Sequence, residues 1–364
     1  MRKAVFSLFP LQTYGSTFSW WENFPKRISE YLGKHGVEHF CLYRGNNKLH
    51  ISDFGKCEAT KAHLQSTLWV LRNLYAKARK FNKAIFHTHA VLQRNGLWIV
   101  NKIFNNNFRW VMTDHDSWES IKFSLTKKIV RKSLRSVGYL PEIVLGCSES
   151  SMERLRNIYG SRNVSFIYNG IDMPNIILPK RASGSPRKAI FIGRLIENKG
   201  LWVLLHAFSL LMKRQIGATL TIVGSGPLYE PMREYVKNNN LAKIVEFVGH
   251  QSDISKLMLN SDFVIIPSVW EENCPIVSLE AQAHYLPAIY SNSGGLPETQ
   301  INGRTGIMVS KNSSEGIVKA IQALQNDVEM FEEMRLDARK NAENFTLDKM
   351  AENYCNLYLE LFDK

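Results

Sequence analysis

Two cationic side chains flank a short loop in the second half of the chain, where they could bind a diphosphate. Residues 193–200 read Gly-Arg-Leu-Ile-Glu-Asn-Lys-Gly and follow the apolar run 189–192. Because this loop leads from a predicted strand into a predicted helix, Arg194 and Lys199 would meet an anion near a helix N-terminus. A guanidinium binds phosphate through two parallel hydrogen bonds, and an ammonium acts as a point charge. The alternative interpretation is that both are solvated surface charges.

Two glutamates in a later loop and helix could bind a polyhydroxylated ligand. Pro275 favours the start of a helix, so the amides of Ile276 and Val277 could bind an anion without any side chain. Glu272 would lie at the loop mouth and Glu280 about one and a half turns into the helix. A carboxylate there suits the vicinal hydroxyls of a ribose. Alternatively, Glu272 only stabilises the helix start and Glu280 is exposed.

A third loop, 294–298, reads Gly-Gly-Leu-Pro-Glu and predicts a tight turn that brings backbone close to a ligand.

These loops require parallel sheets to position them. Short apolar runs bounded by glycine, each followed by a helical pattern, predict strands that are covered on both faces. The predicted strands of the first half are 3–9, 38–43, 84–87, 108–112, 142–147 and 164–167. Those of the second half are 189–192, 219–223, 245–248, 263–266, 287–290 and 306–309. The fold class is therefore α/β, with two doubly wound Rossmann-like domains facing a cleft.

Composition divides the chain into the same two parts. At about 150 residues per domain, 364 residues predict two domains. We expect a first domain at 1–171, a linker rich in proline, glycine and serine at 172–186, and a second domain at 187–345. The apolar pattern of 346–364 predicts a C-terminal helix that packs back on the first domain.

Cysteine usage and hydropathy limit the class of protein. The five cysteines are scattered, are odd in number and lack Cys-x-x-Cys spacing, which argues against a disulfide framework and against a zinc site. No apolar run reaches the length of a membrane span, and no small-residue cleavage site follows the first apolar stretch. We therefore expect a cytoplasmic protein.

Positive charge is concentrated in the first half. Residues 1–180 carry a net charge of +15 and the remainder −2, which together give the formal +13 of the chain. Two clusters carry much of it: Arg72, Lys77, Arg79, Lys80 and Lys83, then Lys122, Lys127, Lys128, Arg131, Lys132 and Arg135. Apolar residues interleave with the second cluster at helical spacing. An anionic membrane surface is the favoured partner; a solvated helix face and, least favoured, nucleic acid are the alternatives.

The order of motifs resembles that of the group 1 retaining glycosyltransferases with the GT-B fold, relatives of bacterial glycogen synthase and sucrose-phosphate synthase. The matching segments are 193–200, Gly224-Ser-Gly-Pro227, Phe247-Val-Gly249-His250, Glu272-x7-Glu280, 294–298 and 302–306. In the first half, His87-Thr-His89, Thr113-Asp-His115-Asp116, 148–150 and 169–172 match more weakly. Family members usually carry a glycine pair in the first loop, whereas this chain has only Gly15 there.

The resemblance implies a catalytic set of Glu272, His115, Arg194 and Lys199. Arg194 and Lys199 would hold the nucleotide diphosphate and stabilise its charge as it leaves. Glu272 would bond the transferred sugar, and His115 would reach that sugar or the acceptor oxygen from the opposite domain. His87 and His89 are interpreted as structural.

The remaining donor-binding residues follow from the same resemblance. Glu280 would bond the ribose hydroxyls, and Gly15 would lie beside the phosphates. The other donor-binding positions implied are Gly224, Gly249, Asn273, Cys274, Pro275, Ile276 and Val277. No metal and no cofactor are expected, since Arg194 and Lys199 can stabilise the departing diphosphate without one.

The resemblance implies a retaining, metal-independent hexosyltransferase that binds a UDP- or GDP-sugar in the domain at 187–345 and the acceptor in the domain at 1–171. A glycan or lipid-linked acceptor in O-antigen, capsule or exopolysaccharide synthesis suits the basic first half, with the protein peripheral on the inner face of the plasma membrane. A nucleotide-sugar epimerase of the same architecture and a non-catalytic nucleotide- or polyanion-binding protein are the alternatives.

Overall fold

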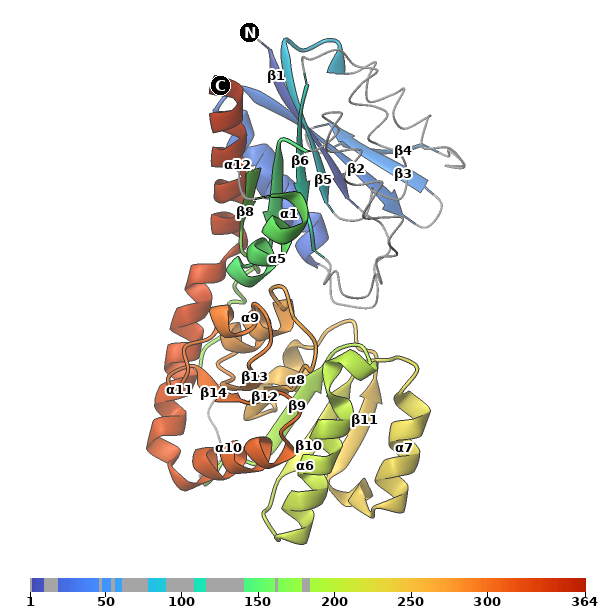
Figure 1. The fold of residues 1–364 in the computed structure, drawn as a ribbon, viewed down its shortest axis with the longest axis vertical. Coiled ribbons are helices and arrows are strands. Elements are labelled where there is room, and N and C mark those ends of the chain that lie inside the picture. The colour runs from blue at the N-terminus through green and yellow to red at the C-terminus, as the bar shows by residue number, and fades with distance from the viewer. Residues whose placement is uncertain are drawn as a thin grey trace. The chain divides into compact units, whose positions relative to one another are not determined.

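The computed structural model divides the chain into two compact units (Figure 1). It describes residues 2–9, 19–45, 48–53, 56–60, 78–89, 108–115, 141–160, 163–178 and 184–364. Of the described residues, the first unit comprises 2–9, those within 21–168, and 348–364, and the second comprises 19–20 and those within 169–347. The division falls after Tyr168 and after Leu347, so the chain crosses from one unit to the other twice in this region.

The first unit is built on a sheet with the strand order β4-β3-β2-β1-β5-β6-β7-β8. The strands are β1 (Lys3–Phe9), β2 (Val37–Gly45), β3 (Lys48–Asp53), β4 (Lys56–Thr60), β5 (Lys83–His89), β6 (Phe108–Thr113), β7 (Ile143–Gly146) and β8 (Val164–Phe166). The strand pairs β2–β1, β1–β5, β5–β6, β6–β7 and β7–β8 are all parallel. The doubly wound parallel arrangement predicted for this half is therefore confirmed for these strands.

Strands β3 and β4 correct the prediction of a purely parallel first sheet. Both pair antiparallel, β3 with β2 and β4 with β3. Only two residues separate β2 from β3, and two separate β3 from β4. Connections this short can only make hairpins, because a parallel return needs a crossover of a dozen or more residues. The local sequence pattern did not predict strands β3 and β4.

The second unit has a six-stranded sheet in which every strand pair is parallel, with the order β11-β10-β9-β12-β13-β14. Its strands are β9 (Lys188–Ile192), β10 (Thr219–Val223), β11 (Val245–Gly249), β12 (Phe263–Ile266), β13 (Ala288–Ser291) and β14 (Gly306–Val309). All residues of β12 and β13 are buried, as expected for central strands covered on both faces.

Six α-helices surround this sheet: α6 (Leu201–Lys213), α7 (Tyr229–Asn238), α8 (Ser255–Leu259), α9 (Ile276–Ala283), α10 (Ser314–Asn326) and α11 (Val328–Ala342). One core cluster lies under α6, α7 and α10, with Leu204, Phe208 and Ile321 fully buried. A second cluster lies under α8 and α9 around Val264 and Tyr290. At about 1.5–3 kcal/mol for each large buried apolar side chain, these two layers fix the strand ends that carry the loops.

In the described ranges, the helices of the first unit are most of α1 (Ser19–Lys34), α5 (Glu149–Tyr159) and most of α12 (Leu347–Asp363). One face of α12 is buried there, and its two tyrosines point into the sheet. The Tyr354 hydroxyl lies 3.1 Å from Thr113 Oγ1, and the Tyr358 hydroxyl hydrogen-bonds His87 Nδ1. The last helix therefore supplies core and polar contacts to strands β5 and β6.

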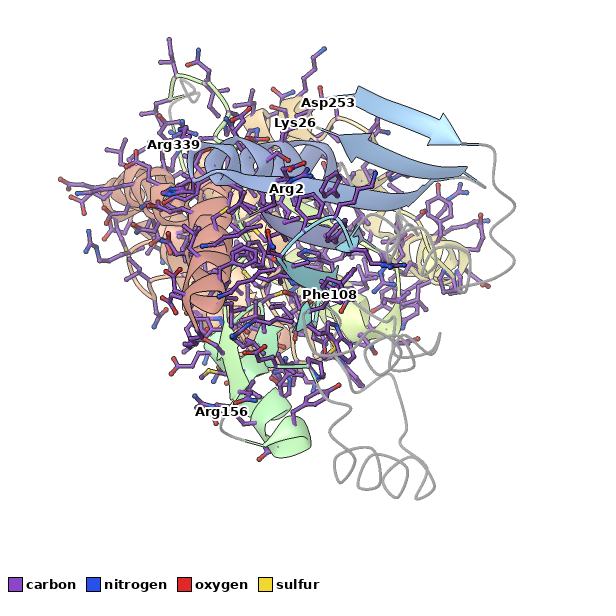
Figure 2. The ribbon with its side chains drawn as sticks, turned by 90° about the horizontal axis from the view of Figure 1, so that it is seen from above. Arg2, Lys26, Phe108, Arg156, Asp253 and Arg339 are labelled. Carbon is purple, nitrogen blue, oxygen red and sulfur yellow. The ribbon has the colours of Figure 1, made fainter. Side chains whose placement is uncertain are left out.

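The segment predicted as a linker is attached to the second unit where it is described. Arg339 of α11 (Figure 2) donates hydrogen bonds to the carbonyls of Pro174 and Ala283. Ser185 donates to the Gln325 carbonyl, and Gln325 donates to the Pro186 carbonyl. These contacts leave residues 172–178 and 184–186 as part of the second unit's surface.

The two chain crossings are bonded to each other within the second unit. The Ile171 amide donates to the Phe345 carbonyl at 2.9 Å, and the Leu347 amide donates to the Ile171 carbonyl at 2.8 Å. Gly170 lies so close that a Cβ there would be 2.4 Å from the Thr346 carbonyl oxygen. Only glycine fits this approach of two backbones.

Within the described ranges, no helix combines the length and the apolar character that a bilayer crossing requires.

Buried histidines make the first unit sensitive to acid. His39 is 1% exposed, with Ser7 Oγ and Ser29 Oγ each 2.8 Å from its ring nitrogens. Burial lowers the pKa of His39 to about 3. The unfolded chain protonates this imidazole below about pH 6.5, whereas the folded state does not. The free energy of unfolding therefore falls as the pH drops from 6.5 toward 3.

We predict that His39→Gln flattens this acid dependence by about 1.4 kcal/mol per pH unit between pH 6 and 4.5. Urea unfolding at a series of pH values measures the slope, with the exposed His35→Gln as the matched control. Equal slopes for both variants and the wild type would contradict a buried neutral His39.

Candidate functional site

Three loops at the carboxyl edge of the second sheet are joined through their backbones. The loop after β9 donates from the Leu195 amide to the Ser225 carbonyl of the loop after β10 at 2.9 Å. The loop after β12 donates from Val269 to the Asn198 carbonyl at 3.1 Å. These bonds bring the predicted diphosphate loop and the predicted glutamate loop side by side.

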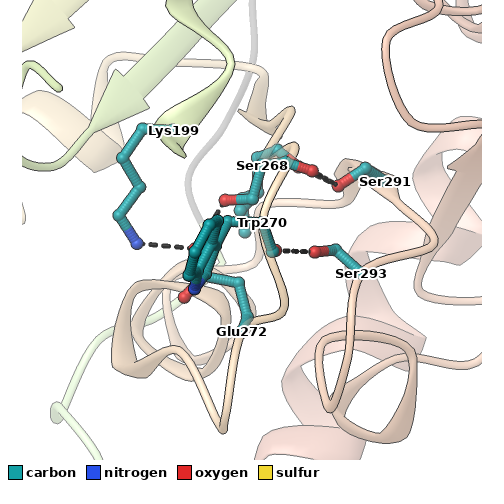
Figure 3. A network of polar contacts seen from close by, with 7 residues as sticks. Lys199, Ser268, Trp270, Glu272, Ser291 and Ser293 are labelled. Atoms are coloured by element: carbon teal, nitrogen blue, oxygen red, sulfur yellow. Dashed lines mark hydrogen bonds and ion pairs between the residues drawn. The ribbon is translucent and has the colours of Figure 1, made fainter. Parts of the chain in front are cut away.

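An ion pair lies where these two loops meet (Figure 3). Lys199 Nζ is 2.6 Å from Glu272 Oε1, and the Ser268 hydroxyl donates to the same oxygen at 2.5 Å. Burial alone would raise the pKa of Glu272, but the charge and hydrogen bond of Lys199, the Ser268 hydroxyl and the charge of Arg194 together lower it. Three of the four residues predicted as catalytic are thus in one electrostatic cluster.

The loop that carries Glu272 is held by serines from the neighbouring strand. Ser291 at the end of β13 donates to the Ser268 carbonyl at 2.6 Å, and Ser293 donates to the Trp270 carbonyl. Lys311 forms an ion pair with Glu271 of the same loop. Ser268, Ser291, Ser293 and Lys311 were not among the predicted site residues. Their only signal was a position just beyond a predicted strand.

Two glycines in these loops are required by close backbone contacts. Gly294 has φ +54°, and a Cβ there would lie 2.2 Å from the Glu272 carbonyl oxygen. Gly224 has φ +142°, and its Cβ would lie 1.8 Å from the Gly193 carbonyl oxygen. The 294–298 turn was predicted to bring backbone close to a ligand. In the structure, the contact that excludes a side chain at Gly294 is with the loop that carries Glu272. The Gly249 carbonyl accepts a hydrogen bond from the Gly224 amide at 2.8 Å, and a Cβ at Gly249 would meet no atom within 4 Å.

Helix α9 begins beside the ion pair. Pro275 is extended, with φ −70° and ψ 117°, and precedes the helix rather than occupying its first helical position. No side chain caps this end, and the amides of Ile276 and Val277 form no hydrogen bond to any residue in the described ranges. Such amides carry partial positive charge and can bind an anion or a hydroxyl.

Asn273 and Cys274 are both buried in the turn before α9. The Cys274 carbonyl accepts from Asn169 Nδ2 at 2.8 Å, which ties the turn to the segment entering the second unit. Burial raises the pKa of the Cys274 thiol to about 12, so this sulfur stays protonated and is not a thiolate nucleophile at neutral pH.

Glu280 lies on α9 and is not part of the ion-pair cluster. No described residue forms a hydrogen bond or ion pair with its carboxylate, whereas its backbone carbonyl accepts from His284. Burial raises the pKa of Glu280 to about 7. A partly withdrawn carboxylate without a protein partner has capacity to accept hydrogen bonds from a ligand's hydroxyls.

His115 belongs to the first unit and lies in a buried polar cluster. Its Nε2 is 3.1 Å from His89 Nδ1, and its Nδ1 is 3.3 Å from Cys147 Sγ. Burial lowers the pKa of His115 to about 4, so the ring is neutral at pH 7. Nearby, His87 lies 2.8 Å from Thr113 Oγ1 and is fully buried. For His115 to bond a ligand, one ring nitrogen must give up its contact with His89 or Cys147.

Several predicted residues lie outside the described part of the chain. They are Gly15, Arg72, Lys77, Asp116 and the whole second basic cluster from Lys122 to Arg135. Of the first cluster, Lys83 donates to the Phe362 carbonyl, so this cation contributes to packing of α12. The described residues contain no group of three histidine, cysteine, aspartate or glutamate side chains arranged to hold a metal ion.

Two family models match consecutive parts of the chain. Residues 174–345 match "Glycosyl transferases group 1", and residues 22–173 match "Glycosyltransferase Family 4". A glycogen synthase of Mycobacterium tuberculosis is 29% identical over 189 residues, which cover 50% of this chain and 45% of that protein. The chain thus spans about half the length of this curated relative.

Solved structures share the whole architecture. A glycosyltransferase from Rickettsia africae aligns over 99% of both chains with a TM-score of 0.77 and 18% identity. The Anabaena protein HepE in complex with UDP aligns over 99% of this chain and 100% of its own, with a TM-score of 0.71 and 18% identity. The prediction of two Rossmann-like domains of the GT-B class is therefore confirmed.

We predict that Glu280→Gln stabilises the protein above pH 7. Since the folded pKa lies above the usual value of 4.5, the folded state binds a proton more tightly than the unfolded chain. Wild-type stability therefore declines as the pH rises from 4.5 to 7, and the glutamine variant lacks this decline.

Thermal unfolding across pH 4.5–8 measures this difference, and Glu246→Gln on the exposed part of β11 is the control. A decline of the same size in Glu280→Gln and wild type would show that the carboxylate is solvated.

Proposed function

Because this chain belongs to the group 1 glycosyltransferases, we propose that it transfers a hexose from a nucleotide sugar to a glycan or lipid-linked acceptor. The observation that carries the proposal is the cluster of Lys199, Glu272 and Arg194 beside the uncapped start of α9. It combines cations suited to a diphosphate with a carboxylate suited to sugar hydroxyls. A nucleotide sugar presents both groups to a protein at once.

The proposed donor is a UDP- or GDP-sugar bound by the second unit. Arg194 and Lys199 would hold the diphosphate, and Glu280 would accept from the ribose hydroxyls. Glu272 and the amides at the start of α9 would bond the sugar. A nucleoside diphosphate is supported by the solved Anabaena relative, whose complex contains UDP.

In the proposed reaction, the bond between the anomeric carbon and the phosphate oxygen breaks while the acceptor oxygen bonds the same face of that carbon. The acceptor's proton passes to the leaving phosphate, so configuration is retained and no protein base is assigned. Negative charge grows on the diphosphate, where preorganised cations contribute most to lowering the barrier. The positive charges of Arg194 and Lys199 would stabilise this negative charge without a metal ion. His115 would bond the sugar or the acceptor.

We further propose that the acceptor is part of surface polysaccharide synthesis and that the enzyme works at the inner face of the plasma membrane. The net charge of +15 in residues 1–180 supports this assignment. Each cation near an anionic surface contributes about 1 kcal/mol of attraction.

We predict that Arg194→Ala and Lys199→Ala each remove about 2–4 kcal/mol of transition-state stabilisation, which is roughly a 30- to 1000-fold loss of turnover. Lys213→Ala, at the far end of α6, is the matched control and keeps wild-type turnover. Transfer is measured by product analysis with donor and acceptor. A loss below tenfold in both variants would contradict the role, and isomerised donor formed without acceptor would indicate an epimerase.

We predict that the full-length protein binds vesicles containing anionic phospholipid at low salt and is released as the salt concentration rises. Sedimentation with phosphatidylglycerol vesicles measures the bound fraction, and neutral phosphatidylcholine vesicles are the control. Absence of retention on anionic vesicles at low salt would remove the membrane assignment while leaving the transferase proposal intact.

A further inference from the structure

The protein engages only one oxygen of the Glu272 carboxylate. Lys199 Nζ and Ser268 Oγ both lie within hydrogen-bond distance of Oε1, at 2.6 and 2.5 Å. Among the residues that the structure describes, none donates to Oε2. The Glu272 side chain is 14% exposed, so its orientation is set mainly by these two donors. One oxygen is therefore held by the protein and the other is left for a ligand.

The two donors differ in how firmly they are held. Lys199 is a flexible side chain that is 25% exposed, and its ammonium has three N–H groups that a diphosphate would compete for. Ser268 is 1% exposed and has one rotatable hydroxyl. When an anion draws the ammonium toward itself, Ser268 remains as the donor that keeps the carboxylate in place.

Ser268 is itself fixed from the next strand. The regular pairing of β12 with β13 ends at Ile266 and Tyr290. Beyond this point the backbones separate, and the hydroxyls of Ser291 and Ser293 reach the carbonyls of residues 268 and 270 instead (Figure 3). The two serine hydroxyls therefore extend the contact between the β12 and β13 chains to residues 268 and 270. The hydroxyl of Ser268 is thus presented by a backbone that is anchored to the sheet.

We propose that Ser268 is a positioning residue for sugar transfer: its hydroxyl holds Glu272 Oε1 so that Oε2 stays aimed at the donor sugar while Lys199 engages the diphosphate. This inference rests on the proposed function. It assigns no contact between Ser268 and the substrate, since the hydroxyl acts through Glu272. The carboxylate would otherwise rotate about its terminal torsion, which has a broad energy profile in glutamate.

The expected signature of Ser268→Ala is a selective loss of turnover. With donor and acceptor saturating, kcat falls at least tenfold, whereas the Kd for free UDP or GDP stays within threefold of wild type. The hydroxyl favours the ionised carboxylate, so its removal raises the pKa of Glu272 and moves the acid limb of the kcat profile to higher pH. Ser268→Thr keeps the donor and restores turnover, whereas Ser268→Cys is a weaker donor and resembles the alanine variant.

Ser314→Ala is the matched control, because it removes a hydrogen bond to the Val203 carbonyl elsewhere in the second unit. It leaves kcat and the pH profile unchanged. Turnover of Ser268→Ala within twofold of wild type, or equal losses of turnover and nucleotide affinity without a shift of the acid limb, would overturn the positioning role.

A double-mutant cycle separates this inference from the proposed function. Ser268→Ala and Glu272→Gln are combined, and the free energy of unfolding is measured for all four proteins. Non-additive effects support the Ser268–Glu272 bond, and additive effects overturn it, whether or not the protein is a transferase. Wild-type protein that neither binds a nucleoside diphosphate nor transfers a sugar refutes the proposed function, and the cycle alone then decides whether Ser268 holds the carboxylate.

Discussion

A carboxylate withdrawn from water must be compensated by donors or cations, and the second unit is organised around this requirement at Glu272. Removing a charge from water without compensation is costly enough that the group would take up a proton instead. Lys199 and Ser268 supply that compensation, with additional charge from Arg194, and they keep the glutamate ionised. Because the lysine comes from the loop after β9 and the serine from the loop after β12, the ionisation depends on the packing of two strands.

The same requirement explains why these loops are so closely bonded to one another. Backbone hydrogen bonds join the loops after β9, β10 and β12, and glycines at 224 and 294 allow contacts that any side chain would block. Ser291 at the end of β13 and Ser293 just after it bond the glutamate loop, and Lys311 pairs with Glu271 of the same loop. Among the described residues, none forms a hydrogen bond with the Glu280 carboxylate or with the first amides of α9. The loops are therefore held together by their own hydrogen bonds, and the Glu280 carboxylate and these amides keep the capacity to bond a ligand.

The first unit uses burial in a different way. Four buried histidines, His39, His87, His89 and His115, have pKa values lowered chiefly by desolvation, and they bond hydroxyls, a thiol and one another. Tyr354 and Tyr358 from the C-terminal helix complete this network. Neutral donors and acceptors in a dry setting stabilise a single arrangement only when each is satisfied, which makes the network vulnerable to acid. A reactive role for His115 has to be reconciled with partners on both of its ring nitrogens.

The sequence by itself determined the alternation of strands and helices, the parallel second sheet, and the loops that carry Arg194, Lys199, Glu272 and Glu280. These features follow from apolar runs, glycine punctuation and spacing, all of which are local. Tertiary structure decided that Lys199 pairs with Glu272, seventy-three positions away, and that Glu280 stands apart from them. It also decided the antiparallel β3–β4 extension and the bonds made by Ser268, Ser291 and Ser293. Such contacts depend on strand order and on where each loop closes, and a one-dimensional pattern does not encode the distance between residues on different strands.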